Sequence, residues 1–424
     1  IRRQRQMCIR DRTRAGAQAC GGYRLMAVLP EYDFRVGWDA KATGAFTFGE
    51  STLGGGDGLG SQLFTDFSGV HDDITDFVRG FRVNRGRDDR LAGTPMGECT
   101  LRLVDLDGRF NPRNESSPLS GQLLPMRPLR VRATHSGVAY GVFRGFIRTI
   151  EHDPVEKVTT IQAGDLFLWL SRVFPTIAST VTTTGGAIGL LLDAVGFTEV
   201  ALRSVDASAG DPVTFSADGS SSALALIEEL LLVERGLFFA DGDGVATYLT
   251  RYDLQGNTTS VATISAPLTA VPSVEVERIR NRASVSVEGG PVQVASDPDS
   301  AATYGWSDVQ PITSVYLVDD AQAASLASYL VTLYRDATGN VRSLRLVNGD
   351  NFSTTQILGR RLQDRVTVLD PVVGSADHVI EGVALELDGV ELFWEATLSE
   401  RGAPGTEFFI FGSGTLGGGD VLGY

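Results

Sequence analysis

The chain has 424 residues, which is more than one ordinary core needs and predicts two or three domains. Hydrophobic residues make up 42% of it and charged residues 21%, as in folded globular proteins and unlike disordered ones. The formal net charge of −15 argues against a protein that wraps DNA or lies on an anionic membrane. No stretch of the sequence approaches the roughly 18 apolar residues of a membrane span.

Segment 1–25 differs in character from the rest of the chain. Residues 6–12 read QMCIRDR and resemble translated sequencing-adaptor read-through. The alternative is a basic arm that binds nucleic acid, although only Tyr23 interleaves its charges with an aromatic ring. We expect residues 1–25 to lie outside the fold, with Met26 as the start. This segment carries seven arginines and one aspartate, a net of +6, so the remainder carries −21.

Two glycine-rich segments bracket the chain, at 26–63 and 401–424. The first contains FGESTLGGGDGLG from Phe48, and the second contains FGSGTLGGGDVLG from Phe411. Triple glycine beside aspartate favours turns and offers little to a core. Neither copy ends in the Lys and Ser/Thr of a phosphate-binding loop. We interpret both as turn-rich edge segments that dock on neighbouring subunits.

Residues 64–164 predict a first all-β domain. Polar and apolar residues alternate there as in half-buried strands. Glycine-containing turns such as Asp107-Gly108 and Ser136-Gly137 separate the strands. The alternating segments are 76–83, 99–104, 129–134, 138–143, 144–150 and 158–163. Closely spaced strands with glycine turns predict a barrel or a curled sheet.

Residues 165–270 predict an α/β unit. Its longest expected helix begins with serines and has Gly236 as its C-terminal stop. Two apolar segments flank the turn 241–244, which reads DGDG, and predict a hairpin. The expected helices are 165–172, 186–195 and 221–235, and the hairpin strands are 237–240 and 245–249.

Residues 271–400 return to strands and predict a second β-rich domain with one helix at 319–336. That helix begins at Asp319, and its small residues Ala324 and Ala327 share a face with larger apolar ones. The expected strands include 283–287, 342–346, 365–369, 378–387 and 392–399.

No arrangement in the sequence predicts catalysis, a metal or a cofactor. The histidines form no i, i+4 pair and flank no cysteine pair, so a zinc site has no support. Asp105 and Asp107 lie two residues apart and could serve a glycosidase, but we interpret them as a solvated hairpin end. The four histidines are His71, His135, His152 and His378.

Residues 105–111 read DLDGRFN and resemble half of a calcium loop. The bidentate glutamate of loop position 12 is missing, because that place is Ser116. A calcium site here stays open as the alternative to a plain turn. Cys99 is the one cysteine outside segment 1–25, so we expect a buried small hydrophobe and no disulfide.

Several short motifs follow one another along the chain, and they contain Arg85, Gly86, Asp107, Gly108, Arg109, Phe110, Pro112, Asn114, Arg127 and Pro128. Their order resembles that in minor tail proteins of siphophages, particularly those that infect actinobacteria. Further likeness lies in Glu234-Arg235-Gly236, Arg280-Asn281-Arg282, Ile380-Glu381-Gly382 and Phe393-Trp394-Glu395. The resemblance covers most of residues 70–400.

Such proteins are similar to the baseplate hubs of tails and injection machines. The resemblance implies a mainly β fold with α+β insertions, in which two β-barrel-like hub domains are joined by small α/β segments. It also implies a homo-oligomeric ring, often a trimer, at the distal end of the tail tube. Its expected partners are the distal tail, tube and tip proteins. We therefore expect a structural virion protein, assembled in the host cytoplasm, that supports host attachment and DNA passage without catalytic residues or a cofactor.

Two other functions stay open. One is a tail-associated hydrolase of cell walls or polysaccharides, against which the lack of a catalytic constellation argues. The other is a receptor-binding tail protein that recognises glycans through exposed aromatic residues such as Trp38 and Trp306. A resemblance along the whole chain, rather than in one terminal module, argues against the second.

Overall fold

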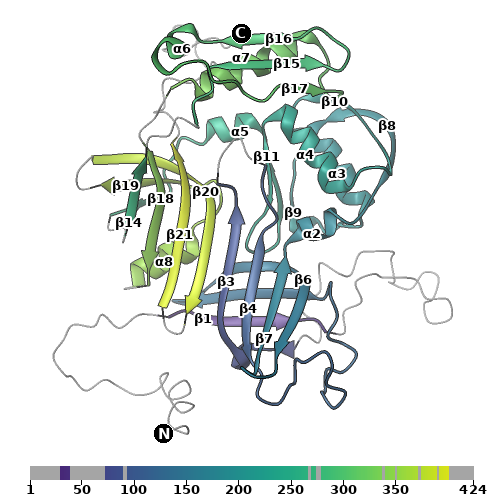
Figure 1. Ribbon diagram of the computed structural model, residues 1–424, viewed down its shortest axis with the longest axis vertical. Helices are drawn as coiled ribbons and strands as arrows, with labels where there is room; N and C mark the ends of the chain where they lie inside the picture. Colours follow the sequence, from purple (N-terminus) through teal and green to yellow (C-terminus); the bar gives the residue numbers. More distant parts are fainter. Residues whose placement is uncertain are drawn as a thin grey trace.

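The computed structural model describes residues 29–38, 72–88, 93–265, 269–273, 278–336, 340–348, 351–370, 374–388 and 391–400. The predicted leader 1–25 and glycine-rich tail 401–424 lie outside the described residues, as does all of segment 26–63 except 29–38. In the view of Figure 1, strands β1 to β7 lie at the bottom, and β18 to β21 lie on the left. Helices α3 and α4 lie on the right, and a small unit with α6 and α7 lies at the top.

One 13-stranded sheet runs through both predicted hub domains. Neighbouring strands on its main path are β14 (Thr269–Ser273), β18 (Asn340–Val347), β21 (Glu391–Glu400), β20 (Gly374–Asp388), β3 (Val78–Gly86), β4 (Glu98–Val104), β7 (Val158–Gly164), β6 (Val138–Asp153), β5 (Pro128–His135), β1 (Glu31–Val36) and β2 (Asp72–Asp73). Two further strands, β13 (Ala262–Ile264) and β19 (Arg365–Asp370), join it through β20. The mainly β fold class predicted from the sequence is confirmed.

The prediction of two β-barrel-like domains needs correction. Among the described residues the strand path has two open ends, at β2 and β14, and no barrel closes. The halves are instead continuous, because β3 of the first pairs with β20 of the second. Strand β1 falls in segment 26–63, which was predicted as glycine-rich without a strand, and its Phe34 and Val36 are buried in the core.

Three small sheets complete the strands. They are β10 (Pro212–Asp218) with β8 (Thr176–Thr183); β11 (Leu237–Ala240), β12 (Ala246–Leu249) and β9 (Arg203–Ser204); and β16 (Gln293–Ser296), β15 (Arg282–Val287) and β17 (Ile312–Ser314). The helices are α2 (Leu166–Leu170), α3 (Thr184–Ala194), α4 (Ala223–Glu234), α5 (Arg251–Gly256), α6 (Pro298–Tyr304), α7 (Asp320–Tyr334) and α8 (Asn351–Gly359). Single 3-10 turns occur at Thr75–Phe77 and Val200–Leu202.

Side-chain capping explains where the predicted helices begin and end. Thr183 and Ser222 accept backbone N–H groups at the starts of α3 and α4, and Asp319 does so for α7. The predicted stop of α4 is displaced by one residue. Arg235, not Gly236, takes the left-handed conformation, with φ 56°. Gly236 is required for a different reason, because a Cβ there would lie 2.6 Å from the carbonyl oxygen of Leu249.

Two hydrophobic clusters divide the molecule. The first lies within the large sheet and contains residues of both hub halves, from Phe34 and Phe81 to Leu385 and Trp394. The second combines α2, α3, α4 and α7 with the small sheets. Helix α7 confirms the helix predicted at 319–336, but its buried Leu326 and Leu330 belong to the second cluster. The predicted domain 271–400 therefore contributes to both cores.

Candidate functional site

The seam between the two halves is an antiparallel pairing of β3 with β20. It runs from Gly86 opposite Gly382 to Gly80 opposite Asp388. Two of the sequence motifs, Arg85-Gly86-Arg87 and Ile380-Glu381-Gly382, thus meet although they lie at opposite ends of the described chain. Backbone hydrogen bonds of a shared sheet make this junction stiffer than a contact through side chains alone.

Glu381 lies at one end of the seam, next to the Gly86–Gly382 pair, where a register shift interrupts the pairing of β20 with β21. Its carboxylate accepts from Arg87 Nε at 3.0 Å and from Gln363 Nε2 at 2.8 Å. Its other oxygen accepts from Ser399 Oγ at 2.6 Å. The side chain of Glu381 is 1% exposed and that of Arg87 is 8% exposed. A buried ion pair with each carboxylate oxygen bonded is costly to break on one side, because the charge that remains buried loses its counter-charge.

Gly86 permits the two backbones to approach at this point. Its φ of +87° is in the left-handed region, and a Cβ would meet the carbonyl oxygen of Glu381 at 2.3 Å. The next residue then donates its backbone N–H to that same oxygen, with Arg87 N to Glu381 O at 2.9 Å. The glycine of the Arg85-Gly86-Arg87 motif is therefore required by backbone geometry.

The α/β unit docks beside the seam through its DGDG turn. The turn is confirmed, since Asp241 Oδ1 accepts from the backbone of Asp243 and Val245 at 2.9 Å each. A Cβ on Gly242 would lie 2.1 Å from the carbonyl oxygen of Gly141 in β6. A Cβ on Gly141 would in turn collide with Asp243 at 2.4 Å. Glycine on both surfaces lets the two backbones contact directly.

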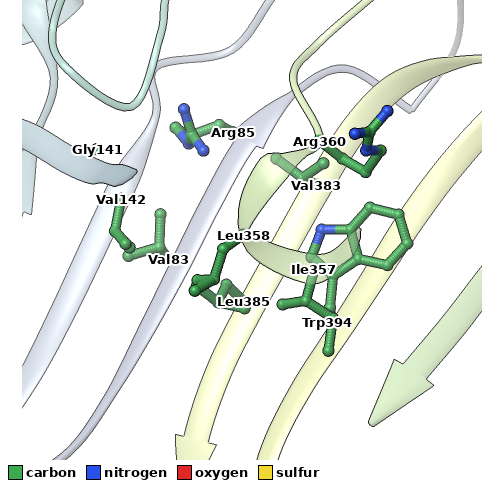
Figure 2. Close-up of a pocket in the computed structure, with 10 residues that line it drawn as sticks. All are labelled: Val83, Arg85, Gly141, Val142, Ile357, Leu358, Arg360, Val383, Leu385 and Trp394. Carbon is green, nitrogen blue, oxygen red and sulfur yellow. The ribbon is translucent and has the colours of Figure 1, made fainter. Parts of the chain in front are cut away.

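A pocket opens where these parts converge (Figure 2). Val83 and Arg85 come from β3, and Val142 comes from β6. Helix α8, which packs against β5, β6 and β18, closes the pocket from the second half. The other lining residues are Gly141, Ile357, Leu358, Arg360, Val383, Leu385 and Trp394. The result is a small pocket lined by apolar side chains and two arginines, built by both halves of the sheet.

The loop after β4 contains most of the remaining motif residues. Phe110 is fully buried and contacts Phe77 edge-on, with ring centroids 5.1 Å apart. Arg109 lies 5.5 Å from the Phe77 ring and forms an ion pair with Asp72 at 3.0 Å. Asn114 Nδ2 donates to the carbonyl oxygen of Gly108, which has φ +69°. These contacts hold the loop in its conformation, and the buried Phe110 joins the loop to the first hydrophobic cluster.

Asp105 is not part of a solvated hairpin end, and that interpretation was wrong. It is 2% exposed, and its Oδ2 accepts from Phe110 N and from Thr159 Oγ1, both at 3.0 Å. His152 Nδ1 also lies 3.2 Å from this oxygen. Because donors occupy the oxygen, Asp105 is arranged to hold the loop rather than a calcium ion. Asp107 is exposed, as expected.

The other motif residues have backbone roles or face solvent. Pro128 begins β5, and its carbonyl oxygen accepts from Gly37 N at 3.0 Å. The carbonyl oxygen of Arg127 accepts from Ile147 N at 2.8 Å. Pro112 is exposed. The structure therefore brings Arg85 and Gly86 together with the Glu381 cluster, and it places Asp107 to Asn114 at a second, separate location.

The histidine, cysteine and tryptophan residues considered as functional candidates mostly occupy structural positions. Across the described ranges, no cluster of three or more His, Cys, Asp or Glu residues is placed to hold a metal ion. His378 is 2% exposed, and burial lowers the pKa of its imidazole. Cys99 is buried as expected, and burial raises the pKa of its thiol. Trp38 was expected to be exposed but is 2% exposed, whereas Trp306 is 56% exposed.

Within those same ranges, no helix is long and apolar enough to cross a membrane.

Two buried acids outside the seam have strongly shifted pKa values. Burial raises the pKa of Asp165, the N-cap of α2, to about 7. Burial, aided by the charge of Asp211, raises the pKa of Glu234 at the end of α4 to about 7. Both carboxylates accept backbone N–H groups, so both hold segments of chain in place.

Sequence reasoning missed Gln363, Ser399 and helix α8. Each of the first two lies between a leucine and an acidic residue, in no recognisable motif, and only the fold brings it to Glu381. Helix α8 reads NFSTTQILG, which has little helical periodicity and contains residues that disfavour helices. Short helices of this kind form because packing stabilises them.

Comparison with known proteins connects this architecture to phage tails. No protein-family model matches the chain, and no curated protein matches it. A tail protein from Neisseria meningitidis MC58 matches in structure at 14% identity, with TM-score 0.55, over 88% of this chain and 98% of that one. The 43 kDa tail protein of prophage MuSo2 from Shewanella oneidensis matches at 12% identity, with TM-score 0.51, over 88% and 97%.

A third structure is an Escherichia coli type VI secretion component described as similar to the phage T4 tail proteins gp27 and gp5. It matches at 13% identity, with TM-score 0.41, over 77% of this chain and 74% of that one. The first two likenesses show that this chain has the fold of those phage tail proteins. The resemblance derived from the sequence motifs is thereby confirmed at the level of the fold.

Proposed function

We propose that this protein is a structural component of a bacteriophage tail tip. It would act as a hub or minor tail protein that forms a ring, most simply a trimer, at the distal end of the tail tube. The observation that carries the proposal is the likeness to two phage tail proteins over nearly their whole lengths. Its partners would be the distal tail, tube and tip proteins.

The architecture suits such a role. One continuous sheet with a buried ionic seam transmits force between its halves better than two domains on a flexible linker. The open strand ends at β2 and β14 are edges to which other subunits could add strands. The excess of acidic residues would repel DNA passing through a ring, so we expect an acidic bore.

Labelling of phage particles tests the placement. An antibody against this chain, viewed by electron microscopy on intact particles, should mark the distal end of the tail. Label along the tube or on the capsid would overturn the proposal.

Native mass spectrometry of the purified chain tests the ring. A closed oligomer is expected, and a monomer at all concentrations would contradict the ring.

Enzymatic activity is tested separately. Zymography on host cell walls should show no clearing beyond that of a heat-denatured sample. Clearing that persists in the purified chain would replace the structural role with a tail-associated hydrolase.

Receptor recognition is tested by binding of the purified chain to host cells or to a glycan array. Binding that is lost in Trp306→Ala would assign a receptor-binding role instead.

A further inference from the structure

The seam pocket contains a cation with no partner among the described residues. Arg85 has its Nε atom buried from solvent without a hydrogen bond. Within the described part of the chain, the Arg85 side chain forms neither a hydrogen bond nor an ion pair, although Asp241, Asp165 and Asp243 lie near enough to influence its charge. Burial lowers the pKa of the Arg85 guanidinium, while the residue as a whole is half-buried.

The neighbouring carboxylates are engaged elsewhere. The oxygens of Asp165 accept from the backbone of Gly97 and Phe167, each at 2.9 Å. Asp241 Oδ1 is held by its own turn, at 2.9 Å from two backbone N–H groups. Asp243 faces Arg132 at 3.5 Å. These acids therefore lower the cost of the buried charge without binding it.

A second arginine lies across the pocket. Arg360 has its Nε and Nη1 atoms buried without a hydrogen bond, and its side chain is 14% exposed. Its ion pair with Asp364 spans 3.6 Å, which is longer than a hydrogen bond. Figure 2 shows Arg85 and Arg360 at the same end of the pocket, with Val383 between them and the apolar side chains below.

We propose that this pocket is a binding site for one oxyanion, a carboxylate or a phosphate, held between Arg85 and Arg360. The planar guanidinium group presents paired N–H donors that match the two oxygens of such anions. The apolar residues beneath exclude water, which strengthens the interaction. Because Arg85 belongs to β3 and Arg360 follows α8, the anion would tie the first half of the sheet to the second. The anion could be free in solution or the side-chain carboxylate of a second copy of this acidic chain.

Thermal unfolding of the full chain tests the site, with inorganic phosphate as the probe. Melting is compared in phosphate and in chloride at equal ionic strength and pH, at a concentration where sedimentation shows a monomer. Phosphate should raise the melting temperature by roughly 2–4 °C over chloride. The increment should vanish in Arg85→Met and, independently, in Arg360→Met. In chloride, Arg85→Met should be no less stable than the parent, because it removes a half-buried charge without a described partner.

The matched control is Arg282→Met, which removes an exposed arginine that is already paired with Asp308 at 2.5 Å. It should keep the full phosphate increment. Phosphate also stabilises proteins non-specifically, so an equal increment in all four proteins, or none in the parent, would overturn the proposal. Because Arg360→Met tests the site alone, a folding failure of Arg85→Met would not decide the outcome.

Sedimentation at higher protein concentration distinguishes the two sources of the anion. If a neighbouring copy supplies the carboxylate, phosphate should dissociate the oligomer, and Arg85→Met should remain monomeric in chloride. If the ligand is a free anion, the oligomeric state should be the same in both salts. Each result is compatible with the site, and the phosphate increment decides whether the site exists.

Discussion

The two cores of this molecule are held together in different ways. The first is divided between segments that lie far apart in the sequence, yet seven residue pairs of β3 and β20 join them in one sheet. The second consists of three sheets of two or three strands, connected through helices and side chains. Its contact with the first core includes the glycine-lined DGDG turn. The difference indicates a stiff frame with a more separable unit docked on it.

The largest effect should come from breaking the buried ion pair between Glu381 and Arg87 at the end of the seam. Glu381→Ala leaves Arg87 buried without its carboxylate, which should lower the free energy of unfolding by about 3–5 kcal/mol. The midpoint of urea unfolding measures this loss. Glu386→Ala is the control, because Glu386 lies on the same strand but is exposed, and its loss should be below about 0.5 kcal/mol. Similar midpoints for the two variants would show that the frame does not depend on this cluster.

Gly86→Ala tests the backbone of the same seam. The substitution places a Cβ against the Glu381 carbonyl oxygen at a positive φ, so it should cost about 2–3 kcal/mol. Gly93→Ala should change stability little, because nothing lies within 4 Å of its Cβ position. Equal melting temperatures for both variants would contradict the close approach of β3 and β20.

The second core should have a pH dependence of its own. The pKa of Glu234 is raised from 4.5 to about 7, so the folded protein holds a proton that the unfolded chain has released. Stability contributed by the protonated acid is therefore present below about pH 4.5 and is lost as pH rises to about 7. The loss is on the order of 3 kcal/mol.

Glu234→Gln should remove this part of the pH dependence of the unfolding free energy, because the amide oxygen can still accept from Asp211 N. Glu229→Gln is the matched control on the same helix, since Glu229 is exposed and should leave the profile unchanged. A profile that stays steep in Glu234→Gln would assign the effect to another group, of which Asp165 is the first to test.

Local sequence signals predicted the elements better than their assembly. Alternation predicted β3, β4 and β5, an apolar run predicted α3, and residues at the helix starts predicted α4 and α7, because these signals depend on neighbours in sequence. The Ser136-Gly137 turn was likewise readable, and both residues have positive φ. No local pattern in the sequence indicates the pairing of β3 with β20. For this reason two separate barrels were predicted where the structure has one continuous sheet.

The candidate site was predictable only in part for the same reason. Arg85, Gly86 and Glu381 were noticed as motif residues, but the sequence could not place them together. Asp105 was misjudged because a turn signal beside an aspartate favours solvent, whereas its carboxylate bonds to Thr159 on β7. Whether a polar residue is buried depends on hydrogen-bond partners that are distant in the sequence, and the local spacing of residues does not indicate those partners.

The smallest and most local effect should come from Gly242→Ala in the docking turn. A Cβ there meets the Gly141 carbonyl oxygen at 2.1 Å, so the turn must lift from β6 while the hairpin keeps its own hydrogen bonds. We expect amides of β11 and β12 to exchange faster with deuterium, by a factor corresponding to about 1 kcal/mol of local stability. Amides of β3 and β20 should keep their protection, because their ladder does not pass through the turn. Gly189→Ala in α3 is the control, since its Cβ enters open space and favours the helix. If Gly242→Ala instead accelerates exchange across β3 and β20, the two cores unfold as one unit, and the docked-unit interpretation fails.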